Sequence, residues 1–206
     1  MSIDADREPR RRRTAEAARA EALSAARDLL LHGGAEAVTL KAVAGEMGVS
    51  HANLIHRFGS AAGLQSALMA EIVEELGDAI RAAAARWLAE GGSPEALVDP
   101  VFRAFDEGGA GRLAARIALS DDPRDLQPVR DALASLTGSL AALFPDAPEV
   151  RRAVSQTVLL VTLTAFGEAV LGGPMREMLE LDDEDARAGT RDAVAGWVAR
   201  RVTERG

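Results

Sequence analysis

Residues 39–58 read Thr-Leu-Lys-Ala-Val-Ala-Gly-Glu-Met-Gly-Val-Ser-His-Ala-Asn-Leu-Ile-His-Arg-Phe. Thr39 is a good helix N-cap, and apolar residues follow it at the spacing of one buried helix face. Gly48 can take the left-handed conformation that ends a helix, and Ser50 can cap a second one. The stretch therefore predicts two short helices joined by a tight turn.

The second predicted helix has two unlike faces. Its apolar side carries Leu54, Ile55 and Phe58, and its other side is mostly polar. Two helices around a glycine turn, the second with a polar outer face, are typical of the helix-turn-helix that enters the major groove of DNA. The alternative is an ordinary corner between two helices of a bundle.

If the stretch binds DNA, some of its residues should contact bases and others the phosphate backbone. The Asn53 amide, in the first turn of the second helix, can bond adenine, whereas Thr39 and Lys41 would meet phosphate. The full set of expected DNA contacts is Thr39, Lys41, Ser50, His51, Ala52, Asn53, His56, Arg57 and Ser60.

A further helix is predicted over residues 14–32, with its stop at Gly33 and Gly34. The three-helix unit resembles the tetracycline-repressor (TetR) family of one-component transcription regulators. The resemblance covers roughly residues 14–68. The matching residues are Ala26, Leu29, Leu30, Gly34, Thr39, Val43, Ala44, Gly48, Val49, Ser50, Leu54, Phe58, Ser60 and Leu64.

The chain departs from the family pattern at four positions. The family usually carries tyrosine at Ile55, histidine or tyrosine at Arg57, lysine at Ala61 and an acidic residue at Ala62. Two expected contacts to the DNA backbone are therefore absent. Arg57 can compensate, because a guanidinium grips phosphate or bonds guanine with two hydrogen bonds.

The charge of the chain is distributed unevenly. Residues 1–60 hold 9 Lys+Arg against 8 Asp+Glu, a net of +1, so residues 61–206 hold 15 against 24, a net of −9. DNA contact is therefore expected only from a domain at 1–60, followed by a second domain at 61–206. The basic tract within 7–13 is either a flexible arm against DNA or a solvated, disordered tail.

Several classes of site and location are not expected. There is no cysteine, and all three histidines precede residue 61: His32, His51 and His56. We therefore predict no metal site, no cofactor and no histidine-based catalysis in the second domain. An enzyme whose corner merely resembles a helix-turn-helix stays a distant alternative. The apolar segment 153–171 is barely long enough for a membrane span and contains Gln156 and Glu168, so we expect a helix buried in a core or a subunit interface, and a cytoplasmic protein.

The second domain shows helical periodicity without a strand pattern, so the whole chain is expected to be all-α, with about nine helices. A stripe from Leu64 to Ile80 predicts one long helix over 60–89. Gly172, Gly173 and Pro174 are expected to end the apolar helix before a last helix near 184–203. The other predicted helices run from about 95 to 106, up to Leu119, and from 126 to 143.

The resemblance implies an effector pocket in this domain and a homodimer formed by its last two long helices, here those near 148–171 and 184–203. Small residues would let the subunits approach closely: Ala153, Ala165, Gly167 and Ala169. The helix at 148–171 can instead be a central core helix. Tentative effector contacts are Phe102, Phe105, Gln156, Thr157, Phe166 and Glu168. The threonines can equally bond their own helix carbonyls, and Glu168 can pair with an arginine.

The sequence thus predicts a repressor that binds a pseudo-palindromic DNA operator as a homodimer. A small and largely apolar effector would release it by tilting the helix at 60–89. A repressor controlled by a partner, or not controlled at all, is the alternative.

Overall fold

The computed structural model describes the backbone of residues 7–91, 93, 95–119, 126–142, 150–182, 188–189 and 191–198; the side chains described are those of the same residues other than 7–14, 88 and 150. Throughout these ranges the regular structure is helical and no strand occurs. The all-α prediction is confirmed for this part of the chain.

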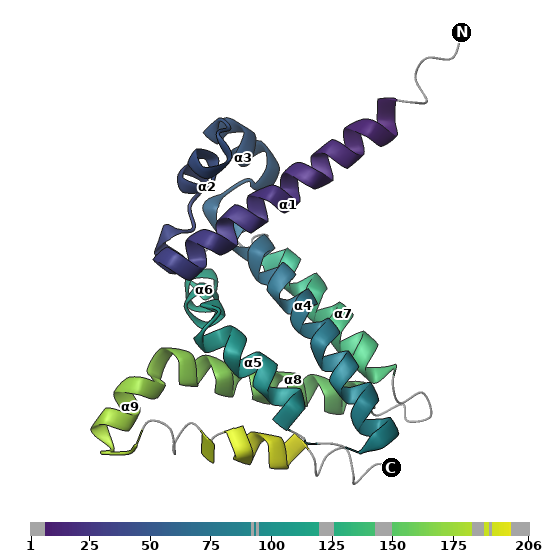
Figure 1. Ribbon diagram of the computed structural model, residues 1–206, viewed down its shortest axis with the longest axis vertical. Coiled ribbons are helices and arrows are strands. Elements are labelled where there is room, and N and C mark those ends of the chain that lie inside the picture. Colours follow the sequence, from purple (N-terminus) through teal and green to yellow (C-terminus); the bar gives the residue numbers. More distant parts are fainter. Residues whose placement is uncertain are drawn as a thin grey trace.

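The N-terminal helices form one unit, called the head below. It consists of α1 (Arg7–Gly33), the 3-10 turn η1 (Ala35–Ala37), α2 (Leu40–Met47) and α3 (His51–Phe58). Figure 1 shows α2 and α3 together on one side of α1, whose N-terminal part extends past them. The core of the head is fully apolar and includes Ala26, Val38, Val43 and Leu54, each at most 1 % exposed.

Hydroxyl side chains begin three successive helices. The Thr39 Oγ1 accepts a hydrogen bond from the Ala42 N–H at 3.1 Å, and the Ser50 Oγ accepts one from the Asn53 N–H at 3.3 Å. Ser60 caps α4 in the same way, 2.9 Å from the Gly63 nitrogen. Gly48 ends α2 with φ 64°, a conformation that glycine adopts without steric cost. The predicted helix-turn-helix is therefore specified by local sequence.

The basic tract is helical. The backbone of residues 7–13 continues α1 and is helical, neither extended nor irregular, and contact of this tract with DNA stays a prediction. The physical reason is that arginine is a good helix former and Pro9 falls in the first turn, where the missing N–H of proline costs nothing.

The remaining helices, called the body, begin with the predicted long helix. They are α4 (Ala61–Glu90), α5 (Glu95–Asp106), α6 (Ala110–Ala118), α7 (Gln127–Ala141), α8 (Val150–Gly167), the π-turn η3 (Glu168–Gly172) and α9 (Gly173–Met178), and residues 191–198 are helical too. In Figure 1, α4 runs from the head into the body beside α7, while α5 crosses α8. The parts of the predicted 184–203 helix beyond 188–198, and its acidic start, lie outside the described residues.

The predicted break at Gly172, Gly173 and Pro174 is wrong. The helical run continues through η3 into α9, and Pro174 falls in the first turn of α9, where its ring is tolerated. A Cβ at Gly172 would lie 2.7 Å from both the Arg176 guanidinium and the Glu168 carboxylate, so a larger residue here would make these side chains shift. These two side chains form an ion pair that passes over Gly172.

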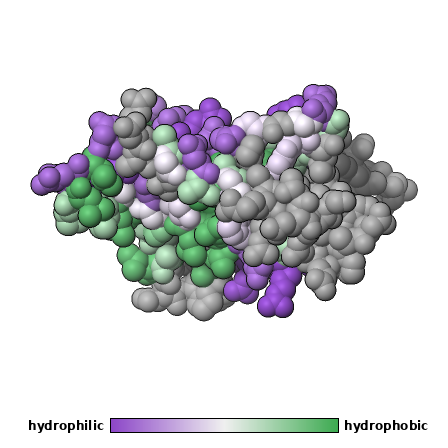
Figure 2. Space-filling view, turned by 90° about the horizontal axis from the view of Figure 1, so that it is seen from below, coloured by the Kyte–Doolittle hydropathy of each residue, from purple (hydrophilic) through white to green (hydrophobic). Residues whose placement is uncertain are grey.

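The apolar helical run is not buried within one chain. By length and composition residues 151–178 could cross a membrane, with a mean hydropathy of 1.6 over 18 residues, of which 11 % are buried. One face of α8 nevertheless packs into the core through Val161 and Ala165, so the two settings predicted for this helix are compatible. Figure 2 shows apolar surface gathered toward the α9 end of the molecule. The exposed apolar side chains of this run are Leu159, Leu163, Val170, Leu171, Met175 and Met178.

Candidate DNA interface and ligand cavity

The outward face of α3 presents His51, Ala52, Asn53 and His56, all exposed. Lys41 is exposed on α2. The opposite face of α3 is anchored by Leu54 and Phe58, which are 1 % and 9 % exposed. The predicted base-reading side chains therefore stand on a short helix whose inner face is fixed by the head core.

The side chains of Arg57 and Ile55 lie in surroundings other than those predicted. The Arg57 Nη1 donates to the carbonyl of Ala15 at 2.5 Å, so this guanidinium holds α3 against α1. Ile55, predicted on the apolar inner side, is 44 % exposed, because the buried stripe of so short a helix is satisfied by Leu54 and Phe58. The predicted contact of Arg57 with DNA would have to compete with its bond to Ala15.

The three hydroxyls predicted at the DNA face are helix caps. In each cap the oxygen accepts a backbone N–H. At Thr39 and Ser50 this leaves the hydroxyl proton as a donor for a phosphate oxygen. The N-termini of α2 and α3 add the partial positive charge that favours an anion. Capping and phosphate contact are therefore compatible at these positions.

A comparison with protein-family models matches residues 22–68 to the model described as bacterial regulatory proteins, tetR family. The match spans the buried half of α1, both helices of the turn, and the start of α4. The chain carries a tetR-family DNA-binding domain. It is therefore a DNA-binding transcriptional regulator. No curated protein matches the chain.

Polar contacts join the tetR-family head to the body at three places. The buried amide of Gln65, on α4, donates to the Val38 carbonyl at 2.8 Å, directly before the cap of α2. Arg116 of α6 pairs with Glu36 of η1. Both α4 and α6 are thereby tied to the segment that leads into the helix-turn-helix.

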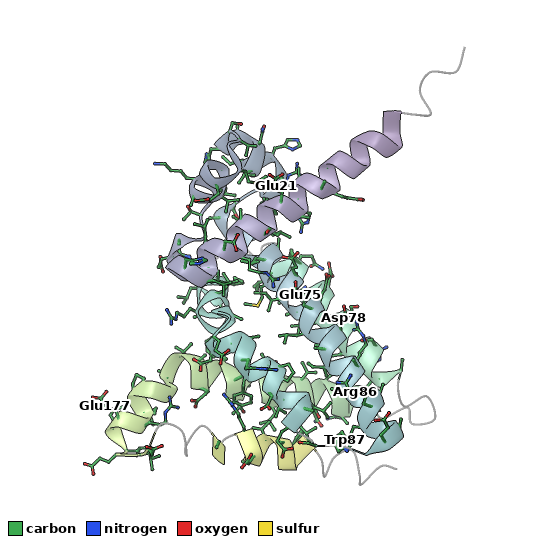
Figure 3. The ribbon with its side chains drawn as sticks, viewed as in Figure 1. Glu21, Glu75, Asp78, Arg86, Trp87 and Glu177 are labelled. Carbon is green, nitrogen blue, oxygen red and sulfur yellow. The ribbon has the colours of Figure 1, made fainter. Side chains whose placement is uncertain are left out.

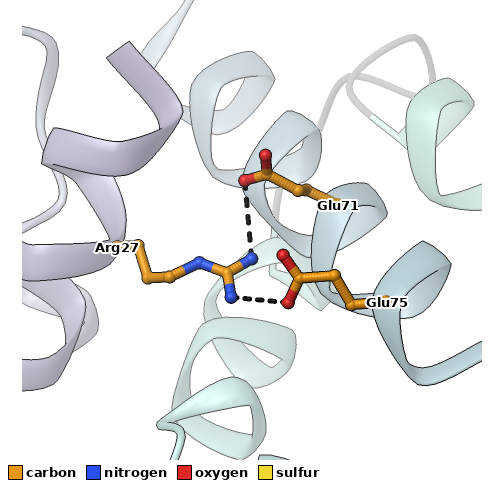
Figure 4. A network of polar contacts seen from close by, with 3 residues as sticks. All are labelled: Arg27, Glu71 and Glu75. Atoms are coloured by element: carbon orange, nitrogen blue, oxygen red, sulfur yellow. Dashed lines mark hydrogen bonds and ion pairs between the residues drawn. The ribbon is translucent and has the colours of Figure 1, made fainter. Parts of the chain in front are cut away.

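The third contact is centred on Arg27 of α1. Its guanidinium lies 2.6 Å from the Glu75 carboxylate and 3.5 Å from that of Glu71, both on α4 (Figure 4). Partial burial by itself lowers the pKa of Arg27, but hydrogen bonds and charge attraction from Glu75 and Glu71 outweigh it, so the pKa lies above the ordinary value. Arg27 therefore stays charged at neutral pH.

The body contains a partly open cavity of about 550 Å³ lined by α4, α5, α6, α7, α8 and Val198. One face of α4 lines it from Met69 to Trp87, and Figure 3 labels Trp87 at the end of α4 far from the head. The volume is that of a site for a small organic molecule. Among the described residues, no three His, Asp or Glu side chains lie close enough together to hold a metal ion.

Only two of the six predicted effector residues line this cavity, Phe105 and Thr157. Gln156 is exposed, one helical step away from Thr157. Phe102 is buried, with the Arg191 guanidinium 5.8 Å from its ring centre.

Phe166 packs against the core of the body outside the cavity lining, and Glu168 pairs with Arg176. The predicted alternatives thus hold in part: Glu168 pairs with an arginine, and the Thr157 hydroxyl donates to the Ala153 carbonyl of its own helix at 2.9 Å. Phe102, Gln156, Phe166 and Glu168 thus lie outside the lining of this cavity, and their effector role stays a prediction.

The main lining was missed because its signal was assigned to packing. The stripe on α4 that continues to Ile80 and Trp87 is visible in the sequence as helical periodicity. Periodicity shows that a helix face is turned inward, but not whether the space opposite is filled or empty.

Proposed function

We propose that the chain is a ligand-responsive repressor, which binds a pseudo-palindromic DNA operator as a homodimer and leaves it when a small apolar effector occupies the cavity. The observation that carries the proposal is the course of α4. This helix begins at Ser60, directly after α3 and Gly59, and its distal half lines the cavity. One continuous helix therefore connects the DNA-reading surface to the ligand space.

The exposed apolar side chains of α8 and α9 support a homodimer. A monomer would leave Leu159, Leu163 and Met175 in water, and a second copy would bury them. The partner surface would consist of this run and the helix near 184–203. Such a dimer places one head on each half-site, in successive major grooves about 34–36 Å apart.

The proposed mechanism is a tilt of α4. A ligand against its distal half changes the separation of the two heads, and thereby the fit to one turn of DNA. Coupling free energies of this kind are about 1–3 kcal/mol and act equally in both directions. Gln65 and Arg27 would transmit the movement, because both bridge α4 to the head.

The proposal is tested by reciprocity. Operator fragments are first selected from random DNA by the purified protein, and mass measurement establishes the protein's oligomeric state with and without them. An effector that weakens DNA binding by a given factor must bind the DNA-loaded dimer more weakly by the same factor. A monomer at micromolar concentration, both free and on DNA, contradicts the proposal. Operator binding that no small molecule alters identifies a constitutive or partner-controlled repressor instead.

Asn53→Ala provides a residue-level prediction for the head. Loss of the amide should weaken binding to the selected operator by about 1–3 kcal/mol and relax the preference at one base position. Lys41→Ala is the matched control, since loss of a phosphate contact weakens binding to all sequences and lowers the salt slope by about one. Equal effects of Asn53→Ala on every sequence would contradict a base-reading role.

A further inference from the structure

The lining of the cavity contains no charged side chain among the described residues. Its polar side chains are Trp87, Thr157 and Thr162. The Thr157 hydroxyl is already bonded to the Ala153 carbonyl, whereas Thr162 makes no hydrogen bond within the described part of the chain. A charged group placed here would lose its water without gaining a partner of opposite charge, which is very costly.

The cavity is also long. The lining residues Met69 and Trp87 stand at opposite ends of an α4 segment that spans about 27 Å at the usual helical rise. A sphere of 550 Å³ would be far shorter than this segment. The empty space is therefore elongated along α4 and favours a slender molecule over a compact ring system.

The size of the ligand follows from a known packing example. An apolar protein cavity of about 150 Å³ accommodates benzene, so a volume near 550 Å³ accommodates about 20 carbon-sized atoms. Apolar cavities of this kind hold no stable water network, because their walls offer too few hydrogen-bonding partners.

We infer that the effector of this regulator is an uncharged, slender molecule with a long hydrocarbon chain, of up to about 20 non-hydrogen atoms and with at most one or two polar atoms. The inference rests on the proposed function and specifies its ligand class. Thr162 positions the polar atom of the ligand, because its hydroxyl can both donate to and accept from an alcohol, an aldehyde or an ester. Long-chain acids and amines bind only in their neutral forms.

The charge requirement is tested with three probes of equal chain length: dodecanol, dodecanoate and dodecylammonium. Binding to the intact protein is measured by calorimetry and by tryptophan emission, since Trp87 lines the cavity. An alkyl carboxyl titrates at about pH 4–5 and an alkylammonium at about pH 10, so forcing either into its neutral form at pH 7 costs about 100-fold in affinity or more. Dodecanol should therefore bind best.

The pH dependence gives a second and sharper readout. Between about pH 6 and 8, the affinity for dodecanoate should fall roughly tenfold per pH unit, whereas that for dodecylammonium should rise by the same factor. The affinity for dodecanol should stay constant. Equal binding of dodecanoate and dodecanol, independent of pH, would show that a charged head group is accommodated and would overturn the inference.

Two adjacent alanines on α4 provide a matched pair of variants. Ala84 lines the cavity, whereas Ala85 is exposed. Ala84→Trp should lower dodecanol affinity at least tenfold by filling the space, and Ala85→Trp should leave it unchanged. Thr162→Val, which keeps the shape and removes the hydroxyl, should cost about 2- to 10-fold for dodecanol and nothing for dodecane.

Failure of the inference can be told apart from failure of the proposed function. If dodecanol binds in the predicted manner but leaves operator binding unchanged, the ligand class stands and the ligand-responsive repressor does not. If a charged probe binds best and releases the operator, the repressor stands and the ligand class is wrong. If no probe binds to a protein that still binds its operator, the inference is wrong.

Discussion

In the head, α2 and α3 each start at a hydroxyl side chain that accepts a backbone N–H, and so does α4 where it leaves the head, whereas α6, α7 and α9, deeper in the body, start without any side-chain cap. The head packs around a filled core, and the body packs around a cavity of about 550 Å³. Each cap stabilises its helix by about 1 kcal/mol. The head is therefore fixed by local interactions, and the body by contacts between residues distant in sequence.

This difference suits DNA reading by the head and the ligand binding proposed for the body. A DNA-reading surface must keep its side chains in one geometry, since a recognition helix meets base edges at fixed positions. A ligand-binding domain must accommodate both an empty and a filled cavity. The body helices α6, α7 and α9 lack side-chain caps, so fewer local interactions fix their ends. The following predictions test this contrast, from the largest effect to the smallest.

The largest effect is expected at the ion pair of Arg176 and Glu168, whose side chains are 6 % and 15 % exposed. Arg176→Met should lower the free energy of unfolding by about 3–5 kcal/mol, because it breaks an ion pair between two largely buried side chains. Urea denaturation measures the change. The control is Arg116→Met, whose partner Glu36 is 85 % exposed, with an expected loss of about 0–1 kcal/mol. Equal losses at both sites would contradict the idea that the body depends on this single distant contact.

Truncation of a leucine should distinguish the filled core from the cavity. Leu54→Ala, in the head, should cost about 2–5 kcal/mol of stability, because a fully buried side chain leaves a hole. Leu133→Ala should cost about half as much, because Leu133 borders the cavity and already lacks neighbours on that side. The same denaturation curves report both. If Leu133→Ala proves the more costly change, the cavity is filled by side chains in solution.

Loss of a helix cap should lower the free energy of unfolding by an intermediate amount. Ser50→Ala should lower the unfolding free energy by about 1 kcal/mol, whereas Ser50→Asp should retain most of it, since a carboxylate also caps. Ser135→Ala, on the exposed face of α7, serves as the control and should change stability by less than about 0.5 kcal/mol. Thermal unfolding followed by circular dichroism measures all three. An effect at Ser135 as large as that at Ser50 would show that the two regions do not differ in this respect.

The smallest effect is expected at Arg27, because its side chain is 31 % exposed and that of Glu75 is 57 % exposed. Arg27→Gln should cost about 0.5–1 kcal/mol, and the cost should shrink at high salt as the charges are screened. The raised pKa of Arg27 predicts no change in this contribution at neutral pH, since the group stays charged. A loss that is independent of salt would show that the side chain stabilises the protein by packing instead of by charge.

The contrast also explains how far the sequence could predict the structure. The helix-turn-helix follows from Thr39, Gly48 and Ser50, whose roles depend on residues at most a few positions away. The sequence predicts a break at Gly172 and Pro174, but the helical run continues through both. The ion pair of Glu168 and Arg176 crosses Gly172 and joins residues on separate turns, so no short sequence pattern reveals it. The lining of the cavity likewise does not follow from the sequence. The six effector contacts are predicted from residue type, and four of them lie outside the lining, because a sequence does not show which helix faces a cavity.

Three alanines on three different helices, Ala84, Ala114 and Ala153, line the cavity. Each is a position at which a larger apolar side chain would occupy empty space instead of displacing a packed neighbour. The volume open to a ligand can thus be shortened from several sides by single substitutions, without any change in the residues that read DNA. If the proposed function is right, natural selection or design can shift the ligand preference toward shorter molecules in steps, while the residues that read DNA stay unaltered.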